Sequence, residues 1–295
     1  MLPIAIVAGL AFGIAVNIVI FVSGRAIIKR RPPDPADSPA NHGMSFEDVT
    51  FPSKYKAELR GWWIPSKKDT EEARGTILFC HGQNGSMDAD LPLAAMVQQA
   101  GYNVLMFNFR AHGTSEGKHV TYGVFEKEDL LGAIDFLRAE RGVQRVGVFG
   151  LSMGAAVAMI AAALTDKISV LILDGAFTRF LTAVQFGIRE RGIPPPFDAI
   201  LAQLAVLGAS IHTNTRMYQV STHLWAKHID NVPTLFIHGE NDPFATLSAM
   251  NLLASDLNGP NEIWVALDCK HREAFQKHPD LYKKQVLGWL EQHCC

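Results

Sequence analysis

A serine between two glycines is the residue with the clearest chemical potential in this chain. Ser152 lies in Gly-Leu-Ser-Met-Gly (150–154), between the apolar run 145–149 and the alanine-rich run 155–164. A sharp turn between a strand and a helix exposes a serine hydroxyl, and the helix N-terminus adds positive potential. The context predicts that Ser152 is a nucleophile. The alternative is a Gly/Ser helix cap without chemistry.

A serine hydroxyl is a poor nucleophile unless a base takes its proton. Of the 11 histidines, His271 is the best placed, because it follows the last predicted strand and precedes the last predicted helix. Asp242 follows the preceding strand and is the candidate acid that orients this base. Two rival acids are Asp174, which ends another strand, and Asp268, which is only three residues from His271. The order Ser, Asp, His along the chain fits a serine on a strand-to-helix turn.

The reaction also requires donors for a developing oxyanion. The glycine-rich segment Cys-His-Gly-Gln-Asn-Gly (80–85) follows another predicted strand. We expect the backbone N–H groups of Gln83 and Met153 to form the oxyanion hole, where each donor contributes about 3 kcal/mol in the transition state. The alternative for this segment is a flexible turn.

Eight short β-rich runs and the helical patterns between them must position these residues. The strands are predicted at 46–51, 59–64, 76–79, 104–109, 146–149, 170–173, 234–237 and 263–266, and the helices at 91–100, 125–140, 153–164, 246–257 and 281–293. This alternation predicts an α/β fold with a mostly parallel sheet and helices on both faces. The first two strands have no helix between them and are expected to form a hairpin. Ligands bind such sheets at the carboxyl ends of the strands.

The N-terminal residues 1–24 are predicted to be a transmembrane anchor. Residues 2–22 carry no charge and would span roughly 30 Å as a helix, which is the thickness of a bilayer core. Basic residues follow at Arg25, Lys29, Arg30 and Arg31. The basic flank predicts a single span with a cytoplasmic catalytic domain. The alternatives are a cleaved signal peptide, which would give a secreted protein, and a buried core helix.

The rest of the chain divides into a linker and one domain. Residues 25–43 are basic and then rich in Pro, Asp and Ser, with nothing to bury, so we expect a linker. Residues 44–295 have the length of a single α/β domain. Its apolar segment at about 175–231, between strands six and seven, is expected to be a cap over an acyl pocket. The alternative is two ordinary core helices.

With these motifs the chain resembles the α/β-hydrolase superfamily of serine esterases, and more narrowly its membrane-anchored members. The resemblance covers about residues 44–293 and rests on His81-Gly82, GLSMG around Ser152, HGENDPF around Asp242 and KHREAF around His271. The family's D-x-R-G-x-G-x-S-x-G stretch is altered here, where Asn108 and Ala111 replace its Asp and Gly. The resemblance implies the α/β-hydrolase fold, with about eight strands and a small helical cap. It implies no metal and no organic cofactor.

Composition narrows the function further. The formal charge is −2, from 27 basic and 29 acidic residues, which gives no reason to expect a nucleic-acid partner. Four cysteines do not make a disulfide framework. We therefore expect a serine esterase that cleaves small-molecule or lipid esters of short to medium acyl chain through a Ser152 acyl-enzyme. The alternatives are a thioesterase or lipase acting on lipidated proteins or membrane lipids, a serine peptidase, and a catalytically silent binding scaffold. The oligomeric state is left open.

Overall fold

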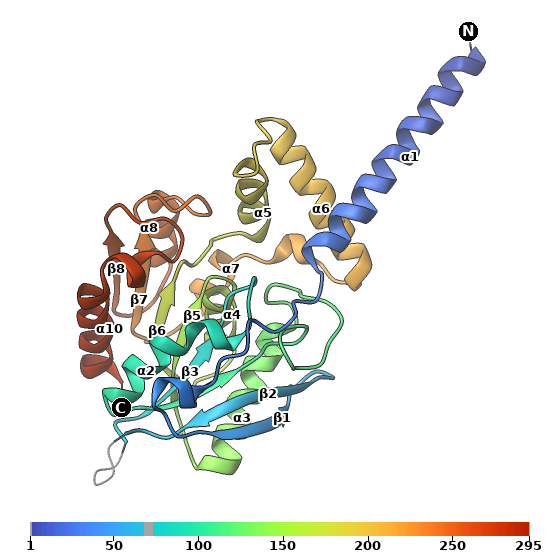
Figure 1. The fold of residues 1–295 in the computed structure, drawn as a ribbon. Coiled ribbons are helices and arrows are strands. Elements are labelled where there is room, and N and C mark those ends of the chain that lie inside the picture. The colour runs from blue at the N-terminus through green and yellow to red at the C-terminus, as the bar shows by residue number, and fades with distance from the viewer. Residues whose placement is uncertain (1, 68–72, 295) are drawn as a thin grey trace.

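One eight-stranded sheet forms the centre of the structure (Figure 1). The structure is a computed structural model that describes residues 2–67 and 73–294. The strands are β1 (Glu47–Pro52), β2 (Glu58–Ile64), β3 (Thr76–Cys80), β4 (Asn103–Phe107), β5 (Val146–Leu151), β6 (Ile168–Asp174), β7 (Thr234–Gly239) and β8 (Asn261–Ala266). Each corresponds to one of the eight predicted strands, with ends that differ by a few residues.

The strand order is β1-β2-β4-β3-β5-β6-β7-β8. Strand β2 pairs antiparallel with β1 and with β4, and every pairing from β4 to β8 is parallel. The predicted hairpin and the mostly parallel sheet are therefore confirmed. Strands β3, β5, β6 and β7 are buried along their whole length, as strands covered by helices on both faces must be.

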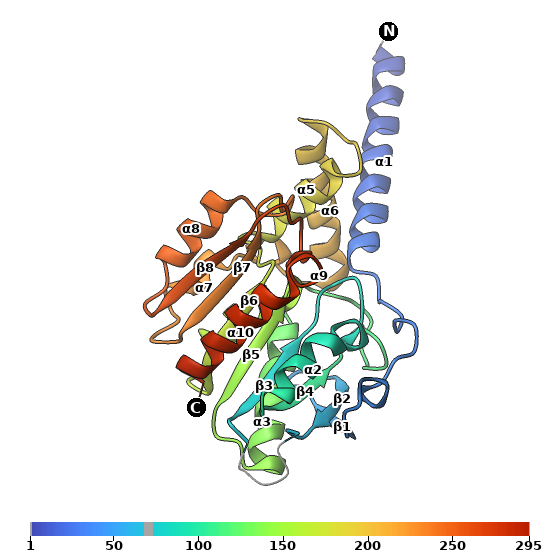
Figure 2. The ribbon, with the colours of Figure 1, turned by 60° about the vertical axis from the view of Figure 1, so that its left-hand side comes forward.

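Helices cover both faces of the sheet (Figure 2). Their buried residues and those of the strands form two hydrophobic cores. One core holds apolar residues of α3 (Glu126–Arg141), α4 (Met153–Ala162) and α8 (Leu247–Ser255). The other holds residues of α2 (Leu91–Gln99) and α10 (Pro279–His293). The five predicted helices are all present. Short helical turns η1 (Pro39–His42), η2 (Met87–Asp90), η3 (Met217–Gln219), α7 (His223–Ala226) and α9 (Ala274–Lys277) connect the elements.

Two further helices lie between β6 and β7, where the cap was expected. They are α5 (Phe180–Arg189) and α6 (Phe197–Thr213). In both views they stand beyond the end of the sheet rather than against its faces (Figures 1 and 2). This placement is that of a cap, and it differs from the alternative of two core helices.

The N-terminal helix α1 (Leu2–Ile27) projects from the body of the protein (Figure 1). Its Ile6–Ile27 stretch has an 18-residue window of mean hydropathy 2.5, none of which is buried. The alternative of a buried core helix is therefore wrong. The helix is long and apolar enough to cross a membrane, which fits either an anchor or a signal sequence.

The segment after α1 packs on the domain, in contrast to the expected linker with nothing to bury. Ile28 is fully buried in the core, and the Tyr122 hydroxyl donates to the Ile27 carbonyl at 2.8 Å. The Arg30 guanidinium donates to three carbonyl oxygens of one turn, those of Gly113, Ser115 and Gly117. Ile28 and Arg30 thus hold the start of this segment on the domain, and neither contact leaves a periodic pattern in the sequence.

Candidate active site

Ser152 lies on a tight turn between β5 and α4. Its backbone has φ 54° and ψ −111°, a conformation that non-glycine residues rarely adopt. The glycines on either side make the turn feasible. A Cβ on Gly154 would overlap the Cys80 carbonyl, and one on Gly150 would lie 2.6 Å from the Cα of Ala155. The turn holds the hydroxyl at the carboxyl end of the sheet.

Ser152, His271 and Asp242 form one hydrogen-bonded chain. Ser152 Oγ lies 2.9 Å from His271 Nε2, and His271 Nδ1 lies 2.7 Å from Asp242 Oδ2. The three residues follow β5, β8 and β7, so three carboxyl ends converge at one point. With its proton on Nδ1, the imidazole donates to the carboxylate and accepts from the serine hydroxyl. This arrangement allows His271 to remove the serine proton.

The surroundings of Asp242 suit an orienting carboxylate. Its side chain is 1% exposed, and its second oxygen accepts a hydrogen bond from the Phe244 N–H at 2.8 Å. The Phe244 ring stands edge-on to the imidazole, with centroids 4.7 Å apart. The carboxylate and the imidazole are thus both fixed by neighbours from the same loop.

The two rival acids are bound elsewhere. The Asp174 carboxylate is buried and accepts a hydrogen bond from the Tyr282 hydroxyl at 2.8 Å, and burial raises the pKa of this carboxyl. Its main-chain oxygen accepts from the Ser152 N–H at 2.8 Å, so Asp174 supports the turn through its backbone. Asp268 is exposed on the surface. Of the three carboxylates, only that of Asp242 contacts His271.

Gln83 and Met153 line the same cavity as Ser152 and His271. Met153 is the first residue of α4, where a backbone N–H has no partner within the helix. Within residues 2–67 and 73–294, neither the Gln83 nor the Met153 N–H donates a hydrogen bond. Both donors are therefore free to bind a negatively charged oxygen.

Two buried histidines fix the loop that carries Gln83. The Nδ1 of His81 lies 2.7 Å from the Gly82 carbonyl, and its Nε2 accepts from the Phe109 N–H at 3.0 Å. His112 Nε2 lies 3.1 Å from the Gln83 carbonyl. Burial lowers the pKa of both imidazoles, that of His81 well below its ordinary value. The two rings thus hold the loop at Gly82 and at Gln83, in contrast to the alternative of a flexible turn.

Sequence reasoning missed a charged pair beside the site. Arg272 Nη2 donates to Asp90 Oδ1 at 2.6 Å, and both residues line the cavity. Arg272 faces Gly82, where an added Cβ would lie 3.2 Å from its Nη1. The buried Arg272 Nε makes no hydrogen bond in the described structure. The only signal available was that Arg272 directly follows His271.

The active-site cavity has a volume of about 910 Å³. Its apolar wall comes mainly from the cap and from the end of α1, through Ile27, Phe177, Phe180, Val184, Ile188 and Leu201. No group of three His, Cys, Asp or Glu residues that could hold a metal ion occurs in the described parts of the chain.

Comparisons with known proteins agree with this architecture. A family model described as the alpha/beta hydrolase fold matches residues 75–208. The Arabidopsis thaliana alpha/beta hydrolase domain-containing protein WAV2 is 35% identical over 269 residues, covering 87% of this chain and 82% of that protein. Bacillus subtilis YqkD is 27% identical, covering 97% of this chain and 94% of that protein. A Pyrococcus furiosus esterase has a similar structure, with a TM-score of 0.76 at 23% identity, covering 91% of this chain and 99% of that one.

Proposed function

The chain belongs to the α/β-hydrolase family, and from this premise we propose that it is a serine hydrolase of carboxylic esters with short to medium acyl chains. The observation that carries the proposal is the unbroken chain of hydrogen bonds from Asp242 through His271 to the hydroxyl of Ser152. A binding scaffold has no need of a base in contact with a strained serine.

In the first half of the reaction Ser152 Oγ attacks the ester carbonyl carbon while His271 Nε2 takes the hydroxyl proton. Asp242 holds the imidazole in the required tautomer and stabilises its positive charge. The carbonyl oxygen becomes an oxyanion and accepts hydrogen bonds from the N–H groups of Gln83 and Met153. His271 then protonates the departing alcohol, and the acyl group remains on Ser152.

In the second half a water molecule replaces the alcohol. His271 removes a proton from this water as it attacks the acyl carbon. The oxyanion forms again in the same hole and collapses, releasing the carboxylic acid, and the proton returns from His271 to Ser152. The cycle needs no group beyond the side chains and backbone donors already described.

The cavity supports an acyl substrate. The cap lines this cavity with apolar side chains, namely Phe177 and Phe180 at its start and Val184 and Ile188 further along α5. The cavity volume of about 910 Å³ is within the range of small-molecule sites. An apolar wall next to the nucleophile favours a substrate with an acyl chain.

The test uses the full-length protein in detergent. We expect a fluorophosphonate probe to label the wild type and not Ser152→Ala, and p-nitrophenyl esters to be hydrolysed with a rate that depends on acyl-chain length. His271→Gln should also lose labelling. His278→Gln is the matched control, because the ring of this histidine in the same segment lies 3.0 Å from the Leu267 carbonyl and is not part of the hydrogen-bonded chain of Ser152, His271 and Asp242. No labelling of a folded wild type would favour the binding scaffold, and a flat response to chain length would exclude an apolar acyl pocket.

A further inference from the structure

The cap helix α6 carries an apolar face that is exposed among the residues that the structure describes. Phe197, Ile200, Leu207 and Ile211 are 63, 52, 46 and 66% exposed. Their spacing of three to seven residues places them along one side of the helix. Gln203 is the one polar residue exposed among them. A continuous apolar surface of this kind marks a site that contacts a membrane or another protein.

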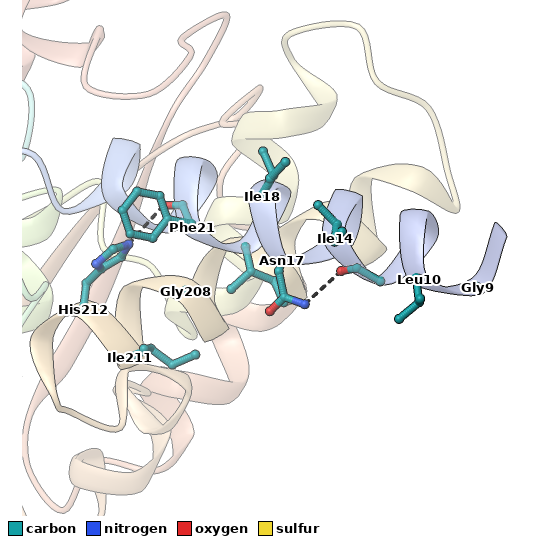
Figure 3. A pocket seen from close by; sticks show the side chains of 11 residues that line it. Gly9, Leu10, Ile14, Asn17, Ile18, Phe21, Gly208, Ile211 and His212 are labelled. Carbon is teal, nitrogen blue, oxygen red and sulfur yellow. Dashed lines mark hydrogen bonds between the residues drawn. The ribbon is translucent and has the colours of Figure 1, made fainter. Parts of the chain in front are cut away.

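This face continues onto α1. A groove of about 720 Å³ runs between the two helices, lined on one side by α1 residues from Gly9 to Phe21 and on the other by Gly208, Ile211 and His212 of α6 (Figure 3). The helices touch through their backbones, because a Cβ on Gly208 would overlap the Ile20 carbonyl. The apolar face of α6 therefore lies beside a helix that is long and apolar enough to cross a membrane.

The polar groups around α1 fit a bilayer. The Asn17 amide donates to the Gly13 carbonyl at 2.8 Å (Figure 3). The Ser23 hydroxyl donates to the Val19 carbonyl, so each of these polar side chains makes a hydrogen bond within the helix. Exposed cations then gather at the end of α1, namely Arg25, Lys29 and Lys118. Lys118 is brought there by the backbone bridge between Lys29 and His119. Such cations lie at the level of lipid headgroups.

Charged residues at the tip of the cap limit how deeply the cap can enter a bilayer. The α5–α6 connection points to the same side of the molecule as the N-terminal end of α1 (Figures 1 and 2). Arg189, Glu190 and Arg191 at this tip are exposed, and Arg189 is paired with Asp198 at 2.6 Å. Charged groups are costly in the hydrocarbon centre, so the cap belongs at the boundary between headgroups and acyl chains.

We propose that α1 is retained as an anchor and that the exposed face of α6 docks on the lipid bilayer beside it, at the headgroup boundary. The backbone contact at Gly208 supports retention, because cleavage after residues 22–24 would remove the α1 side of this crossing. Ser23 and Ala26 of α1 and Leu201 of α6 also line the active-site cavity. With α6 docked, this side of the cavity lies next to the bilayer, and membrane-dissolved acyl esters reach Ser152 from the lipid. This second step rests on the proposed function, whereas the docking does not.

The docking is tested by measuring how deeply a single fluorescent label on α6 of the full chain lies in the bilayer. NBD is attached to Ile200→Cys in a background with Cys294→Ser and Cys295→Ser, since Cys80 and Cys269 are buried. The protein is placed in phosphatidylcholine vesicles with phosphatidylglycerol. We expect a blue-shifted emission, quenching by lipids brominated on the acyl chain, and protection from aqueous iodide. Leu164→Cys is the matched control, because Leu164 is 45% exposed and follows α4 at the opposite end of the sheet.

Each other outcome of the label experiment contradicts the docking. Equal iodide quenching at positions 200 and 164 would show that α6 faces water. Protection from iodide without quenching by brominated lipid would show that protein covers the face, such as a second copy of the chain. Both results are independent of hydrolase activity.

The substrate route is tested by kinetics. Ile200→Asp should lower kcat/KM about tenfold for p-nitrophenyl decanoate dissolved in the vesicles, the ratio expected when one buried aliphatic side chain loses its apolar contact. The same variant should hydrolyse water-soluble p-nitrophenyl acetate like the wild type, and Leu164→Asp should leave both rates unchanged. An equal loss on both esters, or no loss on either, would overturn the route. A wild type inactive on both esters would refute the proposed function and leave the label experiment to decide the docking.

Discussion

The Asp34 carboxylate joins the segment after α1 to the loop that carries Gln83. Asp34 Oδ2 accepts a hydrogen bond from the Ser86 N–H at 2.6 Å, and the Asp34 N–H donates to the Ser86 hydroxyl oxygen at 2.9 Å. A Cβ on Gly85 would lie 2.7 Å from the same carboxylate oxygen, so the two segments are in direct contact. The chain that leaves α1 therefore braces the loop of the proposed oxyanion hole.

Removing the Asp34 carboxylate should impair the catalytic step more than it impairs binding of the ester. In Asp34→Ala the loop loses the carboxylate oxygen that accepts from the Ser86 N–H and lies 3.1 Å from the Ser86 hydroxyl, and keeps only the bond from the backbone N–H of residue 34. The Gln83 N–H is then less well positioned, whereas the apolar wall of the cavity is unchanged. We expect kcat to fall about tenfold and KM to stay within about twofold, because the lost interaction acts mainly in the transition state. Steady-state hydrolysis of a p-nitrophenyl ester measures both constants.

Asp37→Ala is the matched control for that variant. Asp37 lies in the same segment, but its carboxylate accepts hydrogen bonds from Asn41 and pairs with His42 instead of reaching the loop. Its kcat should equal that of the wild type. Equal losses in the two variants would mean that the segment matters for folding and not for the oxyanion hole.

The strands and helices of this protein could be predicted because each leaves a repeating hydrophobic pattern in the sequence. Buried strands such as Leu171–Leu173 are continuous apolar runs, and α3 places Leu130, Ile134 and Leu137 on one buried face. The turns that follow parallel strands lie at one edge of the sheet, which is why the sequence alone could group Ser152, Asp242 and His271.

The contacts that brace the site could not be predicted in the same way. Asp34 and Ser86 are 52 residues apart, and Arg272 and Asp90 are 182 residues apart. A single polar pair at such separation has no period and no motif. The packing of α1 on α6 through Gly208 could not be predicted from the sequence either, because glycine is also common in turns and loops.

The role of Asp242 can be separated from that of Asp174. Asp242→Asn should lower kcat by about 10³- to 10⁴-fold, because an amide in this position favours the wrong imidazole tautomer. Asp174→Asn keeps a carbonyl oxygen for the Tyr282 hydroxyl and the main-chain oxygen that holds the Ser152 N–H, so its kcat should stay within about tenfold of the wild type. A larger loss in Asp174→Asn than in Asp242→Asn would identify Asp174 as the orienting acid. Rates with a p-nitrophenyl ester decide between them.

The turn around Ser152 should tolerate no side chain at Gly154. An added methyl group would overlap the Cys80 carbonyl of β3, so Gly154→Ala should lower the free energy of unfolding by about 3 kcal/mol or more and abolish fluorophosphonate labelling. Gly288→Ala is the control within α10, where an added Cβ meets no heavy atom within 4 Å. It should stabilise the protein by about 0.5–1 kcal/mol. Thermal unfolding tests both, and a wild-type melting temperature for Gly154→Ala would contradict the close packing.

His81 should make stability depend on pH. Its Nε2 accepts the Phe109 N–H, so protonation of this nitrogen would break a buried hydrogen bond, and burial already holds the pKa of His81 well below 6.5. At pH values between that lowered pKa and 6.5 the unfolded chain binds a proton that the folded chain does not. The free energy of unfolding must then decrease as the pH falls below about 6.5, with a slope of up to about 1.4 kcal/mol per pH unit from this histidine.

The test compares melting temperatures at about pH 7.5 and about pH 5.5, which lie on either side of an ordinary imidazole pKa. His81→Asn should melt at a lower temperature than the wild type at the higher pH, because it loses a buried hydrogen bond, yet its melting temperature should fall less on acidification. Some pH dependence remains in this variant, since burial also lowers the pKa of His112 and of His238. His228→Asn, at an exposed position, should keep the wild-type dependence. If His81→Asn and the wild type lose the same stability on acidification, His81 is not held neutral by the fold, and another group must carry the acid sensitivity of the loop.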